Sequence, residues 1–451
     1  MSIATIYSRA LSGIKAPLVT VEVHISNGLP SFSIVGLPET IVKESKDRVR
    51  SAIINSHFEF PARRITVSLA PADLPKDGSR FDLPIAVGIL VASRQIPSND
   101  LSQYEFAGEL GLSGELRAVK GMLPFAIASA QAKRKLILSA LNADEAFLAN
   151  QVTIIAANHL LQVCQHLTHQ KLIPNYFVEN PLTQSVSYPD FSDVKGQNHA
   201  KRAIEIAAAG GHSLLMIGPP GTGKSMLANR IPGILPELSE QEAIEVATVA
   251  SLANHHFNWQ SWRQRPFRSP HHSASSVALV GGGRPPKPGE ISLAHQGILF
   301  LDELPEFDRK VIEALREPLE SGQITISRAA IQAEFPAKFQ LIAAMNPCPC
   351  GYLGDISGKC RCSLEQVARY RQKVSGPILD RIDMHIEVPR VTEGLFTHDS
   401  KHNSEPSEMI KKRVISCRDL QVLRNGKINA RMSHQEINQY CHLTQSEQEY
   451  L

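Results

Sequence analysis

Residues 214–225, Leu-Leu-Met-Ile-Gly-Pro-Pro-Gly-Thr-Gly-Lys-Ser, decide the fold of this chain. Four apolar residues predict a strand, the rest matches Gly-x-x-x-x-Gly-Lys-Ser/Thr, and the following Met-Leu-Ala-Asn-Arg-Ile predicts a helix. A strand, a glycine-rich loop and a helix in this order wrap backbone N–H groups around phosphates. The loop residues are Gly218, Pro219, Pro220, Gly221, Thr222, Gly223, Lys224 and Ser225. We therefore predict an α/β core that binds ATP and Mg²⁺, with Lys224 on the β- and γ-phosphates and Ser225 on the metal.

Two further strand ends supply side chains suited to hydrolysis. The run Gly297-Ile-Leu-Phe-Leu ends in Asp302 and Glu303, and the apolar run Phe339–Met345 ends in Asn346. Asp302 suits the outer shell of groups around the metal, Glu303 suits polarising the attacking water, and Asn346 can orient that water from the neighbouring strand end. Together with the phosphate loop they predict a hydrolase rather than a passive nucleotide binder.

The totals over 451 residues describe ordinary globular protein and point to no partner by themselves. The 47 basic and 44 acidic residues nearly balance, so any basic binding surface must be local. There is no run of eighteen or more apolar residues, and the N-terminus does not match a secretion signal. The seven cysteines are too unevenly spread for a disulfide framework. We expect a cytoplasmic protein.

Changes in pattern divide the chain into four parts. Residues 1–171 alternate strand-like and helical stretches, and residues 172–190 contain three prolines among polar residues, which is typical of a linker. Residues 191–395 return to an α/β pattern and include the phosphate loop. Residues 396–451 begin with a polar connection and continue as predicted helices.

Several long stretches in one order resemble the magnesium-chelatase-like AAA+ proteins, and more closely the ComM/YifB type. They include SIVGLPETIVKESKDRVRSAI, LAPADLPKDGSRFDLPIAVGIL, FRSPHHSASSVALVGGG and SGPILDRIDMHIEVP. The resemblance implies a homohexameric ring with ATP bound between subunits. It also implies that Arg381 is the arginine finger for a neighbour's γ-phosphate. Val194 and Gly196, with Gln197, resemble the segment that packs near adenine.

The resemblance implies a DNA motor that drives branch migration while transforming DNA integrates into the chromosome. A second reading is a magnesium-chelatase-type ATPase subunit that acts with partners in metal insertion. That enzyme's ATPase subunit carries no domain like residues 1–170, which counts against it.

Two segments could contact a DNA backbone without reading bases. The first is a basic stretch ahead of Glu290, and the second is a predicted hairpin over residues 324–333. In related rings a hairpin at this place points into the central pore. The expected contacts are Arg265, Arg268, Arg284, Lys287 and Arg328. Packing between subunits is the alternative role for both segments.

Residues 1–171 resemble the Lon-protease-like fold around Pro75-Lys-Asp-Gly-Ser79 and Gly108–Arg117. Proteolysis by that fold needs a serine activated by a lysine. Here the serine position holds Arg80, and the lysine position falls on Pro124. We expect a non-proteolytic domain, with an ATP-dependent Lon-like peptidase acting through Ser79 as the alternative. The expected architecture is thus a Lon-protease-like α/β domain, an AAA+ P-loop α/β core and a helical lid.

Cys348-Pro-Cys350 and Cys360-Arg-Cys362 form two pairs that could close a tetrahedral zinc site. Four reduced cysteines in a loop are the alternative. Relatives are expected to continue beyond the position of Leu451 into a lid helix whose arginine senses the nucleotide, so we expect the lid to be truncated here.

Overall fold

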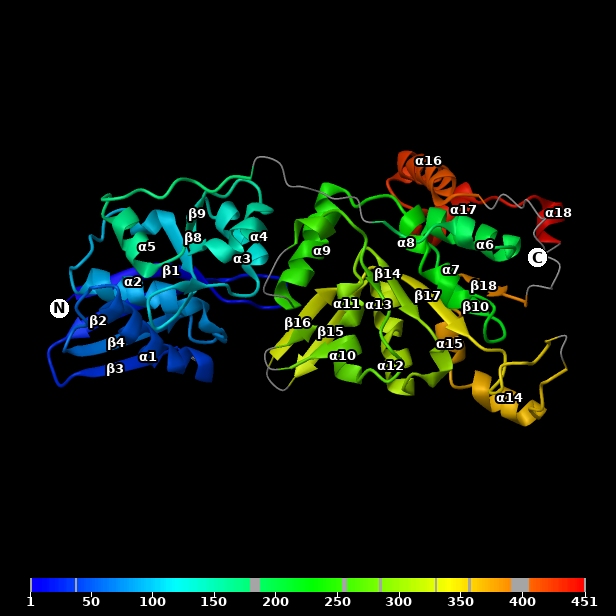
Figure 1. Ribbon diagram of the computed structural model, residues 1–451, viewed down its shortest axis with the longest axis horizontal. Helices are drawn as coiled ribbons and strands as arrows, with labels where there is room; N and C mark the ends of the chain where they lie inside the picture. The colour runs from blue at the N-terminus through cyan, green and yellow to red at the C-terminus, as the bar shows by residue number, and fades with distance from the viewer. Residues whose placement is uncertain are drawn as a thin grey trace.

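The computed structural model describes residues 2–36, 39–178, 187–253, 258–283, 286–328, 331–355, 358–390 and 405–449. They form two α/β bodies side by side and a helical segment that lies on the second body (Figure 1). We call residues 2–178 the N-terminal domain, residues 187–390 the P-loop domain and residues 405–449 the C-terminal helices. Of the predicted linker, 172–190, the structure describes residues 172–178 and 187–190. No described helix is both long and apolar enough to span a lipid bilayer.

The N-terminal domain contains a mixed four-stranded sheet in the order β1-β2-β4-β3 and a parallel three-stranded sheet in the order β5-β8-β9. Every residue of α2 is buried, because this helix is apolar on all sides and packs against β1, β2 and β5. The strands are β1 (Ser2–Arg9), β2 (Leu18–Ser26), β3 (Ser31–Val35), β4 (Arg64–Ala70), β5 (Tyr104–Ala107), β6 (Glu109–Leu110), β7 (Leu116–Arg117), β8 (Lys135–Ser139) and β9 (Ile154–Ala157). The helices are α1 (Thr40–Asn55), α2 (Asp82–Ala92), α3 (Met122–Gln131), α4 (Ala143–Phe147) and α5 (Leu160–Leu167).

The P-loop domain is built on five parallel strands in the order β11-β14-β17-β10-β18. Strands β14 and β17 are buried along their whole length, as expected for central strands covered on both faces. Since all five strands run the same way, the loops after β10, β14 and β17 lie at one edge of the sheet. The strands are β10 (Leu214–Ile217), β11 (Phe267–Arg268), β14 (Ile298–Leu301), β17 (Gln340–Met345) and β18 (Met384–Glu387). The predicted α/β core is confirmed.

Ten α-helices of this domain are described, and most are short. They are α6 (Asn198–Gly210), α7 (Lys224–Ala228), α8 (Ile231–Ile234), α9 (Glu240–Ala253), α10 (Ser276–Val280), α11 (Glu290–Leu293), α12 (Arg309–Ala314), α13 (Arg316–Ser321), α14 (Leu364–Arg371) and α15 (Gly376–Leu379).

Two antiparallel ribbons lie outside the main sheet. Strands β15 (Gln323–Arg328) and β16 (Ile331–Pro336) pair with Arg328 opposite Ile331, which confirms the predicted hairpin. Strands β12 (Gly281–Gly282) and β13 (Lys287–Pro288) form the second ribbon. A Cβ on Gly281 would come within 2.5 Å of Ile326, so the two ribbons pack closely.

Helix α9 joins the two domains. Ser251 on α9 accepts a backbone hydrogen bond from Gly121 at 3.0 Å and donates its hydroxyl to Glu145. Beside these bonds, Leu123 and Leu148 of the N-terminal domain are buried in one apolar cluster with Ala247, Trp259 and Trp262. The domains therefore share a packed interface and not only a linker.

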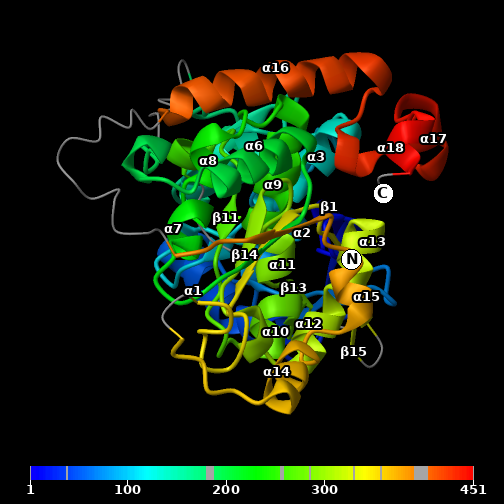
Figure 2. The same ribbon diagram turned by 90° about the vertical axis from the view of Figure 1, so that its right-hand side faces the viewer.

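The C-terminal helices are α16 (Ser407–Asn425), α17 (His434–Tyr440) and α18 (Gln445–Gln448). Figure 2 shows α16 lying across α6 and α8. Arg413 donates to Glu205 on α6 at 2.5 Å, and Arg418 donates to the carbonyl of Ala208 at 2.6 Å. Long α16 is thus fastened to the helix that leads to the phosphate-loop strand.

Candidate ATPase active site

Three strand ends of the five-stranded sheet bring the predicted catalytic groups together. The loop after β10 carries Lys224 and Ser225, β14 leads to Asp302 and Glu303, and β17 leads to Asn346. The ammonium of Lys224 donates to Asn346 Oδ1 at 3.2 Å, and the hydroxyl of Ser225 donates to Asp302 Oδ2 at 2.5 Å. These two hydrogen bonds connect all three strand ends.

Lys224 is a buried cation with neutral partners. Its ammonium donates to the carbonyl oxygens of Gly218 at 2.6 Å and Pro219 at 2.9 Å, and only 8% of the residue is exposed. Burial lowers the pKa of Lys224, while the carboxylates of Asp302 and Glu303 act in the opposite direction. A desolvated ammonium held by neutral oxygens is suited to an anionic ligand such as a phosphate group.

The loop around Lys224 is held at its base and open at its tip. A Cβ on Gly218 would lie 2.2 Å from the carbonyl of Val388, so this glycine allows the loop to meet the end of β18. Gln197 ties the loop to the same place, because its amide donates to the carbonyls of Thr222 at 3.3 Å and Pro389 at 2.7 Å. Gly221 has φ +78, and a Cβ built there would meet nothing within 4 Å. The loop therefore fits the phosphates of ATP, and Ser225 and Asp302 together fit a bound Mg²⁺.

Glu303 is held in place by its neighbours. Its backbone is left-handed, with φ +54, and its N–H donates to Asp302 Oδ1 at 2.9 Å. One carboxylate oxygen lies 3.1 Å from Nδ1 of His272, which follows β11. We did not predict this pair from the sequence, where His272 is only one member of a basic segment far from Glu303.

The segment predicted to lie near adenine leads into α6 and contacts the phosphate loop. Gly196 has φ +66 and is half-buried, and its neighbour Gln197 contacts the phosphate loop. The side chain of Val194, however, is fully buried in the core with Phe191 and Ile204. The place of this segment near adenine therefore stays a prediction, and Val194 could contribute to it only through its backbone.

Arg381 lies at the edge of the sheet opposite to the phosphate loop. It lines a cavity of about 850 Å³ with Ser213 and Gln340, which stand at the amino ends of β10 and β17. It donates to the carbonyl of Pro377 at 2.6 Å and pairs with Glu320. Arg381 thus lies away from the phosphate loop of its own chain.

The structure corrects one of the predicted DNA contacts, that of Arg265. Arg265 has a side chain only 12% exposed, which donates to the carbonyls of Pro236 and Gln296 at 2.8 Å and pairs with Glu242 at 3.3 Å. This guanidinium links parts of the same domain and does not present its charge to a DNA backbone.

The side chain of Arg268 is 40% exposed and pairs with Glu290 through two hydrogen bonds of 2.6 Å, and its predicted DNA contact stays a prediction. Lys287 is exposed on β13. Arg284 and the side chain of Arg328 lie outside the described residues, so their predicted contacts stay predictions.

The described residues bring no serine–lysine pair together at the predicted protease position. The hydroxyl of Ser79 donates to Glu109, and the ammonium of Lys76 donates to the carbonyl of Pro71. Lys120 donates instead to the carbonyl of Ala253 at 2.7 Å, across the domain interface. A carboxylate beside Ser79 does not replace the neutral lysine that this chemistry needs.

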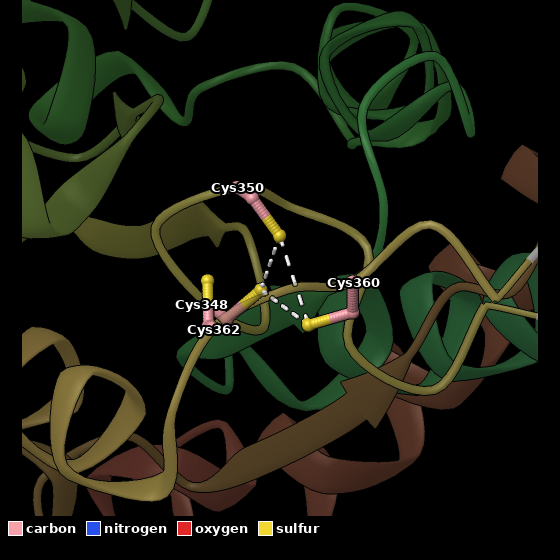
Figure 3. A group of neighbouring side chains, drawn as sticks. All are labelled: Cys348, Cys350, Cys360 and Cys362. Carbon is pink, nitrogen blue, oxygen red and sulfur yellow. Dashed lines mark hydrogen bonds between the residues drawn. The ribbon is translucent and has the colours of Figure 1, made fainter.

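The four clustered cysteines converge on one point (Figure 3). The sulfur of Cys348 lies 3.4 Å from that of Cys350 and 3.8 Å from that of Cys360, and the last two are 3.7 Å apart. With Cys362 included, all four sulfurs lie within 4.8 Å of one another. None of them forms a disulfide.

Three family models match successive parts of the chain. The magnesium chelatase subunit ChlI model covers residues 190–395, a second ChlI model covers residues 21–142, and the ChlI C-terminal model covers residues 404–451. With the phosphate loop and the parallel sheet, they define a magnesium-chelatase-like AAA+ ATPase.

Relatives narrow this class further. The chain is 52% identical to competence protein ComM of Haemophilus influenzae, over 100% of this chain and 89% of the relative. It is also 52% identical to YifB of Salmonella typhimurium, over 100% of this chain and 88% of the relative. The chain belongs to the ComM/YifB family. It is 26% identical to the DNA replication licensing factor Mcm2 of Drosophila melanogaster, over 54% of this chain and 26% of that protein.

Proposed function

We propose that this chain is the subunit of an ATP-driven DNA motor, a homohexameric ring that moves DNA branches while incoming DNA integrates into the chromosome. The observation that carries the proposal is the meeting of Lys224, Ser225, Asp302, Glu303 and Asn346 at one edge of the sheet. Similarity to proteins named as a competence protein and as a DNA replication licensing factor supports DNA as the partner. The cytoplasm is the proposed location.

In the proposed reaction each side chain has one task. Lys224 neutralises charge on the β- and γ-phosphates. Ser225 and Asp302 would hold Mg²⁺, which would supply further charge stabilisation when bound. Glu303 orients the attacking water and polarises its O–H bond. The carboxylate of Glu303 is held by His272 at 3.1 Å. Asn346 orients the same water from the end of β17. Because Lys224 already contacts Asn346 at 3.2 Å, charge and water are positioned by one connected group.

A ring completes this site. Since Arg381 lies at the opposite edge of the sheet from its own phosphate loop, we propose that it serves the nucleotide of a neighbouring subunit. Hydrolysis would then depend on assembly.

The proposed DNA contacts are Lys287, which is exposed on β13, together with Arg284 and Arg328. We place the N-terminal domain in a second, non-proteolytic tier of Lon-protease-like fold, and the C-terminal helices in a helical lid.

A second candidate function has one observation in its favour. All three matching family models are named for a magnesium chelatase subunit, which suggests an ATPase that drives metal insertion. That role predicts dependence on a porphyrin and on partner subunits.

The proposal is tested with a synthetic four-way DNA junction, the full chain, ATP and Mg²⁺. We expect the junction to be converted to duplex products by the wild type and not by Lys224→Ala. If the junction stays intact while added porphyrin and chelatase partners raise ATP hydrolysis, the motor proposal fails and the chelatase role replaces it.

A further inference from the structure

The segment between β17 and α14 carries the four-cysteine cluster (Cys348, Cys350, Cys360 and Cys362) directly beside the nucleotide site. Asn346 directly follows β17, and Cys348 comes two residues later. At the other end Cys362 is followed by Ser363, whose hydroxyl caps α14. The described residues of this segment contain no helix or strand. Its shape must therefore come from side-chain and turn contacts.

The geometry of the sulfurs matches one metal ion. Zinc bound tetrahedrally by thiolates at about 2.3 Å requires sulfurs about 3.8 Å apart. The three distances of 3.4, 3.7 and 3.8 Å lie close to this value and far from a disulfide bond. Three of the four cysteines are at least partly exposed, so burial in an apolar core does not explain why the sulfurs converge. The arrangement fits a metal site better than core packing. A closed set of four soft ligands favours Zn²⁺ in a structural role.

The same segment lies directly against the phosphate loop. Gly351, which follows the second cysteine, has φ +84, and a Cβ there would come within 2.8 Å of Pro220 and 3.8 Å of Asn346. A turn bond of 3.0 Å from the N–H of Gly351 to the carbonyl of Cys348 sets this approach. Gly218, Pro219, Pro347 and Leu353 also line a shared cavity of about 480 Å³. The loop that carries the cysteines thus lies close against Pro220 and near Asn346.

We propose that the four-cysteine cluster binds one Zn²⁺ per chain, and that the zinc-bound loop braces the phosphate loop and Asn346, so that nucleotide turnover depends on the metal. This regulatory part rests on the proposed ATPase function, whereas zinc binding itself does not. Without the metal, closing the segment costs conformational entropy that its few hydrogen bonds do not offset. Asn346 and Pro220 then lose a fixed neighbour, and misplacement by about 1 Å is enough to slow hydrolysis by roughly tenfold or more.

The first test measures zinc and iron by mass spectrometry in the purified full chain. We expect one zinc per chain in the wild type and in Cys417→Ser, whose thiol is exposed and outside the cluster, and none in the double variant Cys350→Ser/Cys360→Ser. Cobalt substitution should give the visible absorption of a tetrahedral thiolate site. Absence of metal in the wild type, or iron in place of zinc, overturns the assignment.

The second test separates bracing from metal binding with two glycines. Gly351→Ala forces a Cβ against Pro220, whereas Gly354→Ala has a similar φ of +78 but meets nothing within 4 Å. We expect both variants to keep zinc, and only Gly351→Ala to lose roughly tenfold or more in hydrolysis rate and in affinity for a fluorescent ATP analogue. Equal activity of the two variants, or full activity after chelation, overturns the brace. If the wild type hydrolyses no ATP, the proposed function fails, while zinc content and analogue affinity still decide this inference.

Discussion

Replacing His272 with Ala tests whether the contact with Glu303 matters for chemistry. The Nδ1 to carboxylate distance is 3.1 Å, and the two side chains are 35% and 53% exposed. At such exposure the contact is worth about 1 kcal/mol, less than a buried charged hydrogen bond. If that energy holds Glu303 in its working position, losing it slows hydrolysis roughly fivefold, since about 1.4 kcal/mol corresponds to tenfold in rate.

The assay is steady-state ATP hydrolysis by the full chain. We expect kcat to fall about fivefold in His272→Ala with KM for ATP unchanged, because Glu303 acts on water and not on the nucleotide. His272→Gln keeps a hydrogen-bond donor and should recover most of the rate. His434→Ala, an exposed histidine on α17, is the matched control. An unchanged kcat in His272→Ala, or a KM that rises in proportion, would refute the reasoning.

Four further predictions concern the ring, the domain interface, the C-terminal helices and DNA. The variant Arg381→Ala should bind ATP normally and hydrolyse it roughly 10³-fold more slowly. If the arginine acts on a neighbouring subunit, mixing this variant with Glu303→Gln should restore part of the hydrolysis rate. No recovery in the mixture would contradict this role. Leu123→Ala opens a cavity in the interdomain cluster, so the free energy of unfolding measured with urea should fall by about 2–4 kcal/mol, whereas Leu141→Ala, at a residue 60% exposed, should have little effect. Arg413→Gln removes the ion pair between α16 and α6, and because this guanidinium is 44% exposed the loss should be only about 1 kcal/mol. Burial raises the pKa of Glu205, but the hydrogen bonds from Arg413 and Arg202 lower it on balance. A carboxylate whose pKa is lowered by folding stabilises the folded state at any pH above its pKa in the unfolded chain, which is about 4.3. This stabilisation is lost as the pH falls through the lower pKa of the folded state. When thermal unfolding is measured at decreasing pH, the stability of Arg413→Gln should therefore fall less than that of the wild type. The variant Lys287→Ala should bind DNA of every sequence equally more weakly, and the slope of log affinity against log salt concentration should fall by about 1. An unchanged slope would show that Lys287 does not contact the DNA backbone.

The nucleotide site could be predicted from the sequence because its parts are local. A phosphate loop requires its own backbone shape, and acids at the ends of buried parallel strands must share an edge with it. Lys224, Ser225, Asp302 and Asn346 accordingly meet as a connected group. The convergence of the cysteines followed in the same way from two short pairs joined by turns.

What the sequence hid depends on partners far along the chain. Arg265 is in a basic segment but is crosslinked internally to Glu242 on α9, and no local pattern signals that burial. His272 meets Glu303 only because β11 and β14 are neighbours in the sheet. The contact between Gly351 and Pro220 likewise joins two loops that are adjacent only in the fold.

The most direct test of the motor proposal is ATP hydrolysis by the full chain with and without four-way junction DNA, in the wild type and in Glu303→Gln. We predict that the junction stimulates ATP hydrolysis by the wild type. The variant Glu303→Gln should bind ATP but hydrolyse it neither with nor without the junction. Hydrolysis that is the same with and without DNA would contradict a DNA motor.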